Sequence, residues 1–217
     1  MRLWTGLLDL LFPPKCPFCG SVRDKPEICP ACWKALPWTE EARSLRELEG
    51  GLRCAAPLWY KGIVRDGIRR FKFHGAAASA GPLGELVARA AAERFPGEFD
   101  TVTWVPVSAK RLRRRGYDQS RLLAESACRC WGAAPERLLR KVRDNPAQSG
   151  LSGAAERREN PRGAYEAAGD LSGKRVLLID DVCSTGSTLN ACGEALRAAG
   201  AAEVVCAAVA FPAPEEA

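Results

Sequence analysis

The sequence predicts an α/β fold, in which a parallel sheet flanked by helices follows a small cysteine-rich module. Three features of the chain support this prediction. Residues 176–179 form an apolar run without polar alternation, as expected of a strand buried on both faces. Residues 101–107 form a second strand-like segment, and each of these segments leads through a polar stretch into a helix. Two Cys-x-x-Cys pairs precede them, between Cys16 and Cys32.

Composition and length narrow the classes of protein to consider. The 217 residues accommodate one domain of common size and a small additional module. Hydrophobic residues make up 47% of the chain and charged residues 27%, which excludes a disordered composition. No run approaches the ~18 apolar residues of a membrane span, and Asp9 interrupts the segment 3–12 where an export signal would lie. We therefore expect a cytoplasmic protein with reduced thiols.

The net charge of +6 is unevenly distributed along the chain. Basic residues gather in two groups, Lys110, Arg111, Arg113, Arg114 and Arg115, and Arg157, Arg158 and Arg162. Such groups favour polyanionic ligands over a generally basic surface.

At the N-terminus, the leucines of residues 3–12 fit one face of a short helix. We expect this face to pack on the body of the protein, because the segment lacks the basic residues of a lipid-binding helix.

The two Cys-x-x-Cys pairs predict a structural zinc ribbon. Each pair forms a tight turn whose thiolates converge on one ion, and four sulfurs complete a tetrahedral shell. The predicted ligands are Cys16, Cys19, Cys29 and Cys32. Thioredoxin-like redox chemistry needs one such pair at a strand–helix junction, whereas this chain has two in a proline-rich stretch. An iron–sulfur cluster is the remaining alternative.

The elements between the two modules follow from periodicity and turn residues. We expect the N-terminal helix, the ribbon and a charged linker in residues 1–50, and the main domain in residues 51–217. The main domain should begin with a strand and turn at 54–62, a helix at 63–73 that ends near His74, and a helix at 76–95 interrupted near Gly81 and Pro82.

The core of the main domain is predicted next. The strand 101–107 should open into a basic loop and a helix at 119–131, followed by a strand at 138–142. The polar, turn-rich stretch 144–162 has the composition of a mobile lid. A closing strand at 203–211 completes the sheet.

The segment after residue 179 is the strongest functional signal. Asp180 and Asp181 end the apolar run, and a loop of Ser, Thr and Gly leads into a helix. Backbone N–H groups and the dipole of such a helix favour an anion at the loop. A P-loop is excluded because no Lys follows Gly186. A sugar phosphate fits this arrangement, with its phosphate in the loop 184–188 and its vicinal hydroxyls on the two carboxylates.

This segment resembles the 5-phosphoribosyl-1-pyrophosphate (PRPP) motif of type I phosphoribosyltransferases. The whole chain resembles the ComF family of bacteria, in which a zinc ribbon is fused to a domain of this type. The matching segments are Cys16–Cys32, Tyr60-Lys61-Gly62, Phe71–Gly75, Arg114–Gln119, Pro146–Leu151, Arg157-Arg158-Asn160 and Asp180–Thr188. Asp118 departs from the Asn that is frequent in the family, and both residues accept hydrogen bonds.

The resemblance implies roles for individual residues. The PRPP-binding residues would be Asp180, Asp181, Val182, Cys183, Ser184, Thr185, Gly186, Ser187 and Thr188. The catalytic residues would be Asp180 and Asp181, which hold the ribose hydroxyls and assist Mg²⁺, and Lys110 and Arg115, which neutralise the departing pyrophosphate. Lys72 is a further candidate for contact with pyrophosphate.

Three functions stay open at this point. The chain could be a phosphoribosyltransferase whose acceptor the sequence does not name. It could instead be a non-catalytic, PRPP-sensing competence factor that acts with the DNA-import machinery, because the family is named for a role in DNA uptake. It could also bind single-stranded DNA through the ribbon and the arginine groups, with Trp33 and Trp38 available for base stacking.

Overall fold

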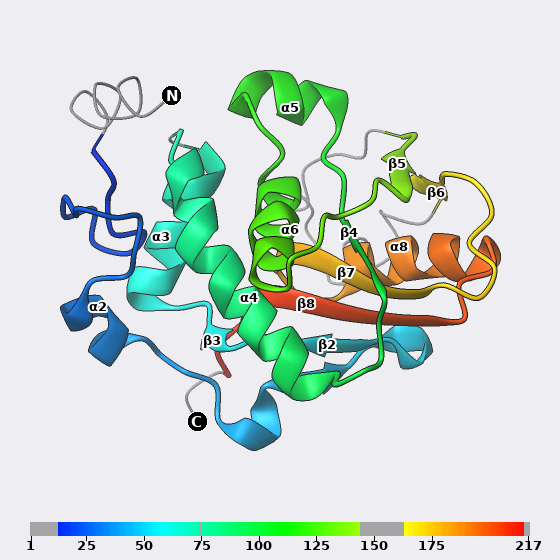
Figure 1. The fold of residues 1–217 in the computed structure, drawn as a ribbon, viewed down its shortest axis with the longest axis horizontal. Coiled ribbons are helices and arrows are strands. Elements are labelled where there is room, and N and C mark those ends of the chain that lie inside the picture. Colours follow the sequence, from blue (N-terminus) through cyan, green and yellow to red (C-terminus); the bar gives the residue numbers. More distant parts are fainter. Residues whose placement is uncertain (1–12, 74, 144–162, 215–217) are drawn as a thin grey trace.

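The computed structural model describes residues 13–73, 75–143 and 163–214 (Figure 1). The predicted N-terminal helix, His74 and the predicted lid lie outside the described residues. The second arginine group, at 157, 158 and 162, lies outside them as well.

The central sheet has the strand order β1-β2-β8-β7-β4, with β3 also paired to β8. Its strands are β1 (Leu45–Glu47), β2 (Arg53–Ala55), β3 (Leu58–Trp59), β4 (Thr101–Trp104), β7 (Arg175–Val182) and β8 (Glu203–Phe211). All pairs are parallel except β1 with β2. Two further strands, β5 (Leu139–Lys141) and β6 (Tyr165–Ala167), form a separate antiparallel pair.

Helices cover both faces of this sheet (Figure 1). The α-helices are α2 (Pro30–Ala35), α3 (Gly62–Phe73), α4 (Ala80–Arg94), α5 (Ala109–Arg115), α6 (Gln119–Cys130) and α8 (Ser187–Ala198). Short 3₁₀ turns are η1 (Glu41–Arg43), η2 (Glu49–Gly51) and η3 (Ala77–Ser79). The mixed α/β architecture with a mostly parallel sheet confirms the predicted fold class.

The core lies in two layers, one on each side of β7 and β8. Leu177 and Ile179 pack with side chains of α3, α4 and α6, whereas Val176 and Leu178 pack with side chains of α8. All four side chains have no exposed surface. The absence of polar alternation in this run is therefore explained, because each face of the strand is covered by helices.

Three predicted local structures were wrong. The basic segment Lys110–Arg115 is part of a helix, capped by Ser108, whose Oγ accepts from the N–H of Arg111 at 3.3 Å, and ended by Gly116 at φ 80°. Pro82 does not interrupt α4, because it occupies the first turn, where a missing N–H costs no intrahelical hydrogen bond. The predicted linker contains β1, which extends the sheet.

The other predicted elements were placed well. The helix expected at 119–131 is α6, and the strand expected at 203–211 is β8. However, β8 does not close an edge of the sheet, since β7 lies on one side of it and β2 and β3 on the other. Within the described ranges, none of the helices is long and apolar enough to cross a bilayer.

Candidate anion site and metal centre

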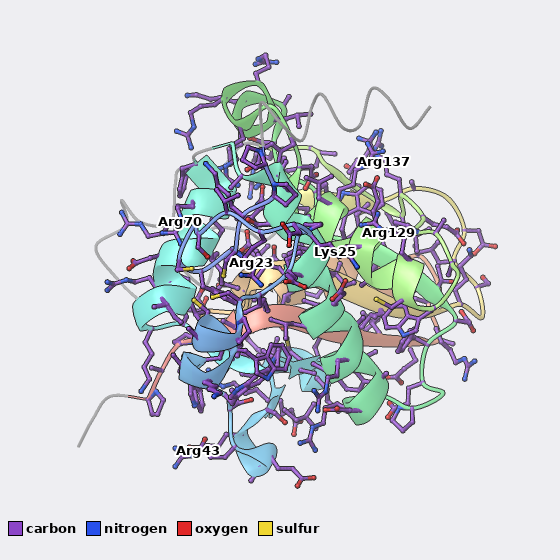
Figure 2. All side chains as sticks on the ribbon, turned by 60° about the vertical axis from the view of Figure 1, so that its left-hand side comes forward. Arg23, Lys25, Arg43, Arg70, Arg129 and Arg137 are labelled. Atoms are coloured by element: carbon purple, nitrogen blue, oxygen red, sulfur yellow. The ribbon has the colours of Figure 1, made fainter. Side chains whose placement is uncertain are left out.

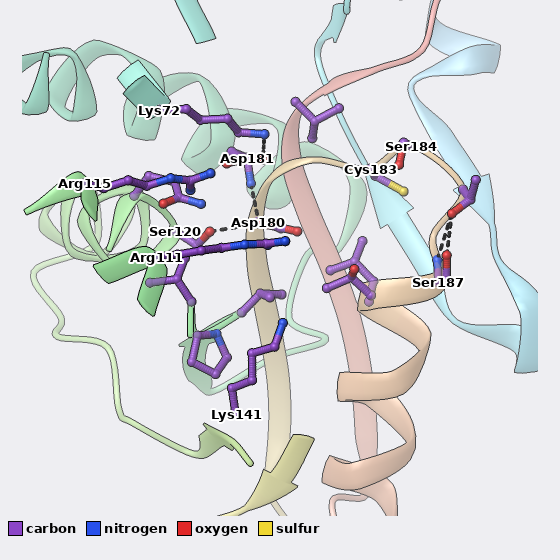
Figure 3. Close-up of a pocket in the computed structure, with 18 of the residues that line it drawn as sticks. Lys72, Arg111, Arg115, Ser120, Lys141, Asp180, Asp181, Cys183, Ser184 and Ser187 are labelled. Atoms are coloured by element: carbon purple, nitrogen blue, oxygen red, sulfur yellow. Dashed lines mark hydrogen bonds and ion pairs between the residues drawn. The ribbon is translucent and has the colours of Figure 1, made fainter. Parts of the chain in front are cut away.

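A cavity of about 820 Å³ lies at the carboxyl ends of β4 and β7, where parallel sheets bind their ligands. Its walls come from α3, from the segment after β4, from α5 and the start of α6, and from the β5–β6 pair. Its floor includes the whole predicted PRPP segment, 180–188. The structure therefore brings the acid pair, the hydroxyl-rich loop and part of the arginine group into one cavity (Figure 3).

Asp180 is a partly buried carboxylate at the end of β7. Its Oδ1 accepts hydrogen bonds from Ser120 Oγ and from the N–H of Asp181, both at 2.8 Å. Burial and the adjacent charge of Asp181 raise the pKa of Asp180 to about 7, although Lys72 and the two hydrogen bonds oppose this rise. Asp180 therefore gains or loses a proton near neutral pH.

Asp181 is more deeply buried and forms an ion pair. Lys72 Nζ lies 2.8 Å from its Oδ1 (Figure 3). Burial disfavours the charged lysine, but the carboxylate of Asp181 outweighs burial and raises the pKa of Lys72. The second oxygen, Oδ2, is buried and has no hydrogen-bond partner in the part of the chain that the structure describes. One oxygen of Asp181 is thus left for a ligand.

The loop after β7 leads directly into the N-terminus of α8. Gly186 precedes the helix at φ 79°, and a Cβ at this position would lie 3.0 Å from the side chain of Leu48. The hydroxyls of Thr185 and Ser187 form a hydrogen bond, and Thr185 Oγ1 accepts from the N–H of Ser187 at 3.4 Å. This local arrangement places hydroxyl groups and the first N–H groups of α8 at the cavity, as an anion site requires.

Among the residues that the structure describes, seven cationic side chains and two carboxylates line the cavity. They are Arg65, Arg69 and Lys72 from α3, Arg111, Arg114 and Arg115 from α5, and Lys141 from β5. This excess of positive charge suits a ligand with several negative charges. Lys110, predicted to act on pyrophosphate, is exposed and does not line the cavity, whereas the neighbouring Arg111 does.

Lys72 of α3 was a candidate for this site from the sequence, whereas the contributions of Arg65, Arg69 and Lys141 were not predicted. Arg65, Arg69 and Lys72 follow one another at helical spacing of four and three residues, so they share one face of α3. The sequence shows that spacing, but no residue pattern within the helix indicates that this face lines the cavity. Lys141 Nζ lies 3.1 Å from Tyr165 Oη, and burial raises the pKa of Tyr165.

Three buried polar atoms of the cavity lining lack a hydrogen-bond partner within residues 13–73, 75–143 and 163–214. They are Arg115 Nε, Gln119 Oε1 and Asp181 Oδ2. Unsatisfied buried atoms are uncommon in folded proteins, and their concentration in one cavity indicates a site completed by a polar ligand.

Asp118 has a structural role at the edge of the site. It caps α6 by accepting from the N–H of Arg121, and its Oδ2 accepts from the N–H of Val107 and from Trp104 Nε1. These bonds join the end of β4 to the start of α6, which positions Ser120 against Asp180. Burial raises the pKa of Asp118, and the hydrogen bonds oppose the rise.

The four predicted zinc ligands form one cluster. The Sγ atoms of Cys16, Cys19, Cys29 and Cys32 all lie within 4.8 Å of one another. The distance between Cys19 and Cys29 Sγ is 3.7 Å, close to the ~3.8 Å edge of a tetrahedron with the Zn–S distance of about 2.3 Å.

A backbone N–H group favours the thiolate form of Cys29. Cys32 N–H lies 3.4 Å from Cys29 Sγ, and this bond is the main cause of the lowered pKa of Cys29. The donor set and geometry therefore fit a closed, structural Zn²⁺ site. Of the other six cysteines, five are buried thiols and Cys130 is exposed.

Comparisons with known proteins agree with both parts of the molecule. Residues 107–216 match the family model of the phosphoribosyl transferase domain, and residues 7–46 match the double zinc ribbon domain. The chain is 38% identical to competence protein F of Haemophilus influenzae over 105 residues, which cover 46% of this chain and 45% of that protein.

Two further relatives align over most of the chain. DNA utilization protein YhgH of Salmonella typhimurium is 28% identical over 87% of this chain and 86% of its own length. Competence protein ComFC of Bacillus subtilis is 25% identical over 88% of this chain and 74% of its own length. These relatives confirm the resemblance to ComF proteins. The chain therefore belongs to the phosphoribosyl transferase domain family and carries a double zinc ribbon at its N-terminus.

Proposed function

We propose that the cavity binds PRPP together with Mg²⁺ and that the chain transfers its phosphoribosyl group to an acceptor. One observation carries this proposal: the acid pair of β7 stands next to a helix N-terminal loop, inside a cavity to which the described residues contribute seven cations. The carboxylates suit vicinal hydroxyls, the loop suits a terminal phosphate, and the cations suit pyrophosphate. PRPP combines all three groups in one molecule.

In this proposal the protein acts by position and charge. Residues 184–188 hold the 5-phosphate through hydroxyls and N–H groups. Asp180 and Asp181 accept hydrogen bonds from the ribose hydroxyls and are the carboxylates available to Mg²⁺, which would neutralise pyrophosphate oxygens. Val182 and Cys183 complete the backbone between the two subsites.

Arginines would stabilise the charge that develops as pyrophosphate leaves C1 of the ribose. Arg115 suits this role because its Nε is buried at the cavity and has no partner among the described residues. Arg111, which lines the cavity, replaces the exposed Lys110 in this proposal. The ion pair with Lys72 would hold the side chain of Asp181 in position at the cavity.

Two experiments test binding and catalysis separately. Calorimetric titration of PRPP in the presence of Mg²⁺ should give saturable binding to the zinc-loaded chain, stronger than that of ribose 5-phosphate, because pyrophosphate adds contacts to the basic wall. A screen of nucleobases and amines for pyrophosphate release should then identify an acceptor. Absence of PRPP binding would refute the proposal, whereas binding without release in the screen would favour a PRPP-sensing role.

A second candidate function is binding of single-stranded DNA in the cytoplasm, alongside competence or DNA-import proteins. Relatives named for competence and DNA utilization support it. Phe73 supports it as well, because its ring is 52% exposed at the cavity and has Arg115 4.9 Å from its centre, an arrangement that suits base stacking. If DNA uses this cavity, saturating PRPP should weaken DNA binding. Unchanged DNA binding would place it on another surface.

A further inference from the structure

Helix α3 contacts the zinc ribbon on one side and lines the anion cavity on the other. Arg65, Arg69 and Lys72 line the cavity. At about 100° per residue, Gly67 and Arg70 point to the roughly opposite side of the helix. Figure 2 shows Arg70 on this side, next to the ribbon.

The contacts between α3 and the ribbon are close and directional. The guanidinium of Arg70 donates from Nη2 to the carbonyl oxygens of Pro17, at 3.1 Å, and Phe18. Gly67 allows this approach, since a Cβ on it would lie 2.7 Å from the Pro17 oxygen and 2.8 Å from the Phe18 ring. Phe18 itself is 2% exposed and belongs to the same core layer as α3.

The ribbon residues in this contact lie between two of the predicted metal ligands. Pro17 and Phe18 form the turn from Cys16 to Cys19, and the geometry of this turn fits both thiols to one ion. A bound metal fixes such a turn, because a small ribbon gains most of its folding free energy from the metal. Loss of the metal should therefore release the two carbonyl groups that Arg70 contacts.

We infer that occupancy of the zinc site sets the affinity of the cavity for polyanions, with Gly67 and Arg70 as the positioning residues that connect the two. The inference rests on the proposed function only in that the cavity must bind a polyanion. The metal-bound ribbon holds α3 in the position that places Arg65, Arg69 and Lys72 at the cavity. The helix stays in the core when the ribbon loosens, because its side chains Val64, Ile68 and Phe71 are fully buried. Loss of zinc therefore changes the position of the cavity wall and does not unfold the main domain.

The test measures binding of inorganic pyrophosphate with Mg²⁺ to the full-length chain by calorimetry. Zinc-loaded protein is compared with protein stripped by a chelator and kept reduced, with no free zinc in either cell. We expect removal of zinc to weaken binding about fivefold or more, the lower end of common coupling between sites. Circular dichroism checks that the stripped protein retains its helices.

A variant separates the coupling from the stability of the ribbon. Arg70→Ala should keep one zinc per chain, bind pyrophosphate more weakly than wild type, and respond less to removal of zinc. Arg70→Lys should recover part of the affinity. Arg129→Ala is the control, because it removes the same charge from an exposed position on α6 outside the cavity lining.

The possible results distinguish failure of the coupling between zinc and the cavity from failure of the proposed function. Equal affinity of folded stripped and zinc-loaded wild type overturns the coupling but leaves the proposed function intact. If the stripped protein loses its helices, zinc-loaded Arg70→Ala decides: affinity equal to that of Arg129→Ala overturns the coupling. If zinc-loaded wild type binds neither pyrophosphate nor PRPP, the proposed function fails, and the coupling fails with it.

Discussion

Replacing Asp180 by Asn should change how the free energy of unfolding depends on pH. The variant should gain stability relative to wild type as the pH rises from acidic to alkaline values. The pKa of Asp180 is raised from 3.8 to about 7 in the folded chain, so the folded state keeps this proton at pH values where the unfolded chain has lost it. Wild type therefore loses stability as the pH rises from about 4 to 7. Asn does not ionise, and its side-chain oxygen can still accept from Ser120 and from the N–H of residue 181.

The expected size follows from the two pKa values. Between pH 5 and pH 8, ionisation of Asp180 costs the folded wild type about 2–3 kcal/mol relative to the unfolded chain, and the Asn variant avoids this cost. Urea unfolding of both proteins at the two pH values measures the difference. Asp181→Asn is the contrast, because it breaks the ion pair and leaves the partly buried Lys72 without the carboxylate of Asp181, so it should destabilise the protein. A stability difference between wild type and Asp180→Asn that does not change with pH would refute the reasoning.

Three further variants test other parts of the structure. Cys29→Ser should lose the roughly one zinc per chain expected of wild type and unfold the ribbon; full zinc content by elemental analysis would contradict the metal assignment. Gly186→Ala should lower the free energy of unfolding in urea by about 1–2 kcal/mol because of its positive φ. The loss should exceed that of Gly97→Ala, since Gly97 has a similar φ but no atom within 4 Å of the new Cβ. Equal losses would show that the contact with Leu48 has no effect. Thr188→Ala should weaken PRPP binding only about two- to tenfold, because the backbone donors of α8 remain; a larger loss in calorimetry would assign the phosphate to the hydroxyl.

Local sequence patterns predicted the structure correctly where hydrophobic pattern or residue spacing determines it. The run from Val176 to Ile179 had to be buried on both faces, and the structure places it in β7, an interior strand between β8 and β4 that is parallel to both. The two Cys-x-x-Cys turns each bring two sulfurs together, so the four-cysteine cluster followed from spacing alone. The fold class and the metal centre could therefore be predicted.

Prediction from the sequence failed where helix caps determine the local structure or where tertiary contacts place a side chain at the cavity. The prediction of a loop for the arginine-rich segment missed Ser108 and Gly116, which cap and end a helix there. The ion pair between Lys72 and Asp181 could not be predicted, because it depends on how α3 crosses the end of β7. For the same reason the sequence did not reveal that Arg65 and Arg69 join Lys72 at the cavity.

Calorimetric titration of PRPP with Mg²⁺ into wild type, Asp180→Asn and Asp181→Asn tests the central claim most directly. A hydrogen bond to a charged group contributes roughly 1.5–3 kcal/mol, so each variant should bind PRPP about ten- to a hundredfold more weakly at pH 8. The double variant should lose still more, without strict additivity, because both side chains would hold one sugar. Asp24→Asn removes the same charge from an exposed position on the ribbon and should bind PRPP like wild type. Equal PRPP affinity across all of these folded proteins would contradict the account.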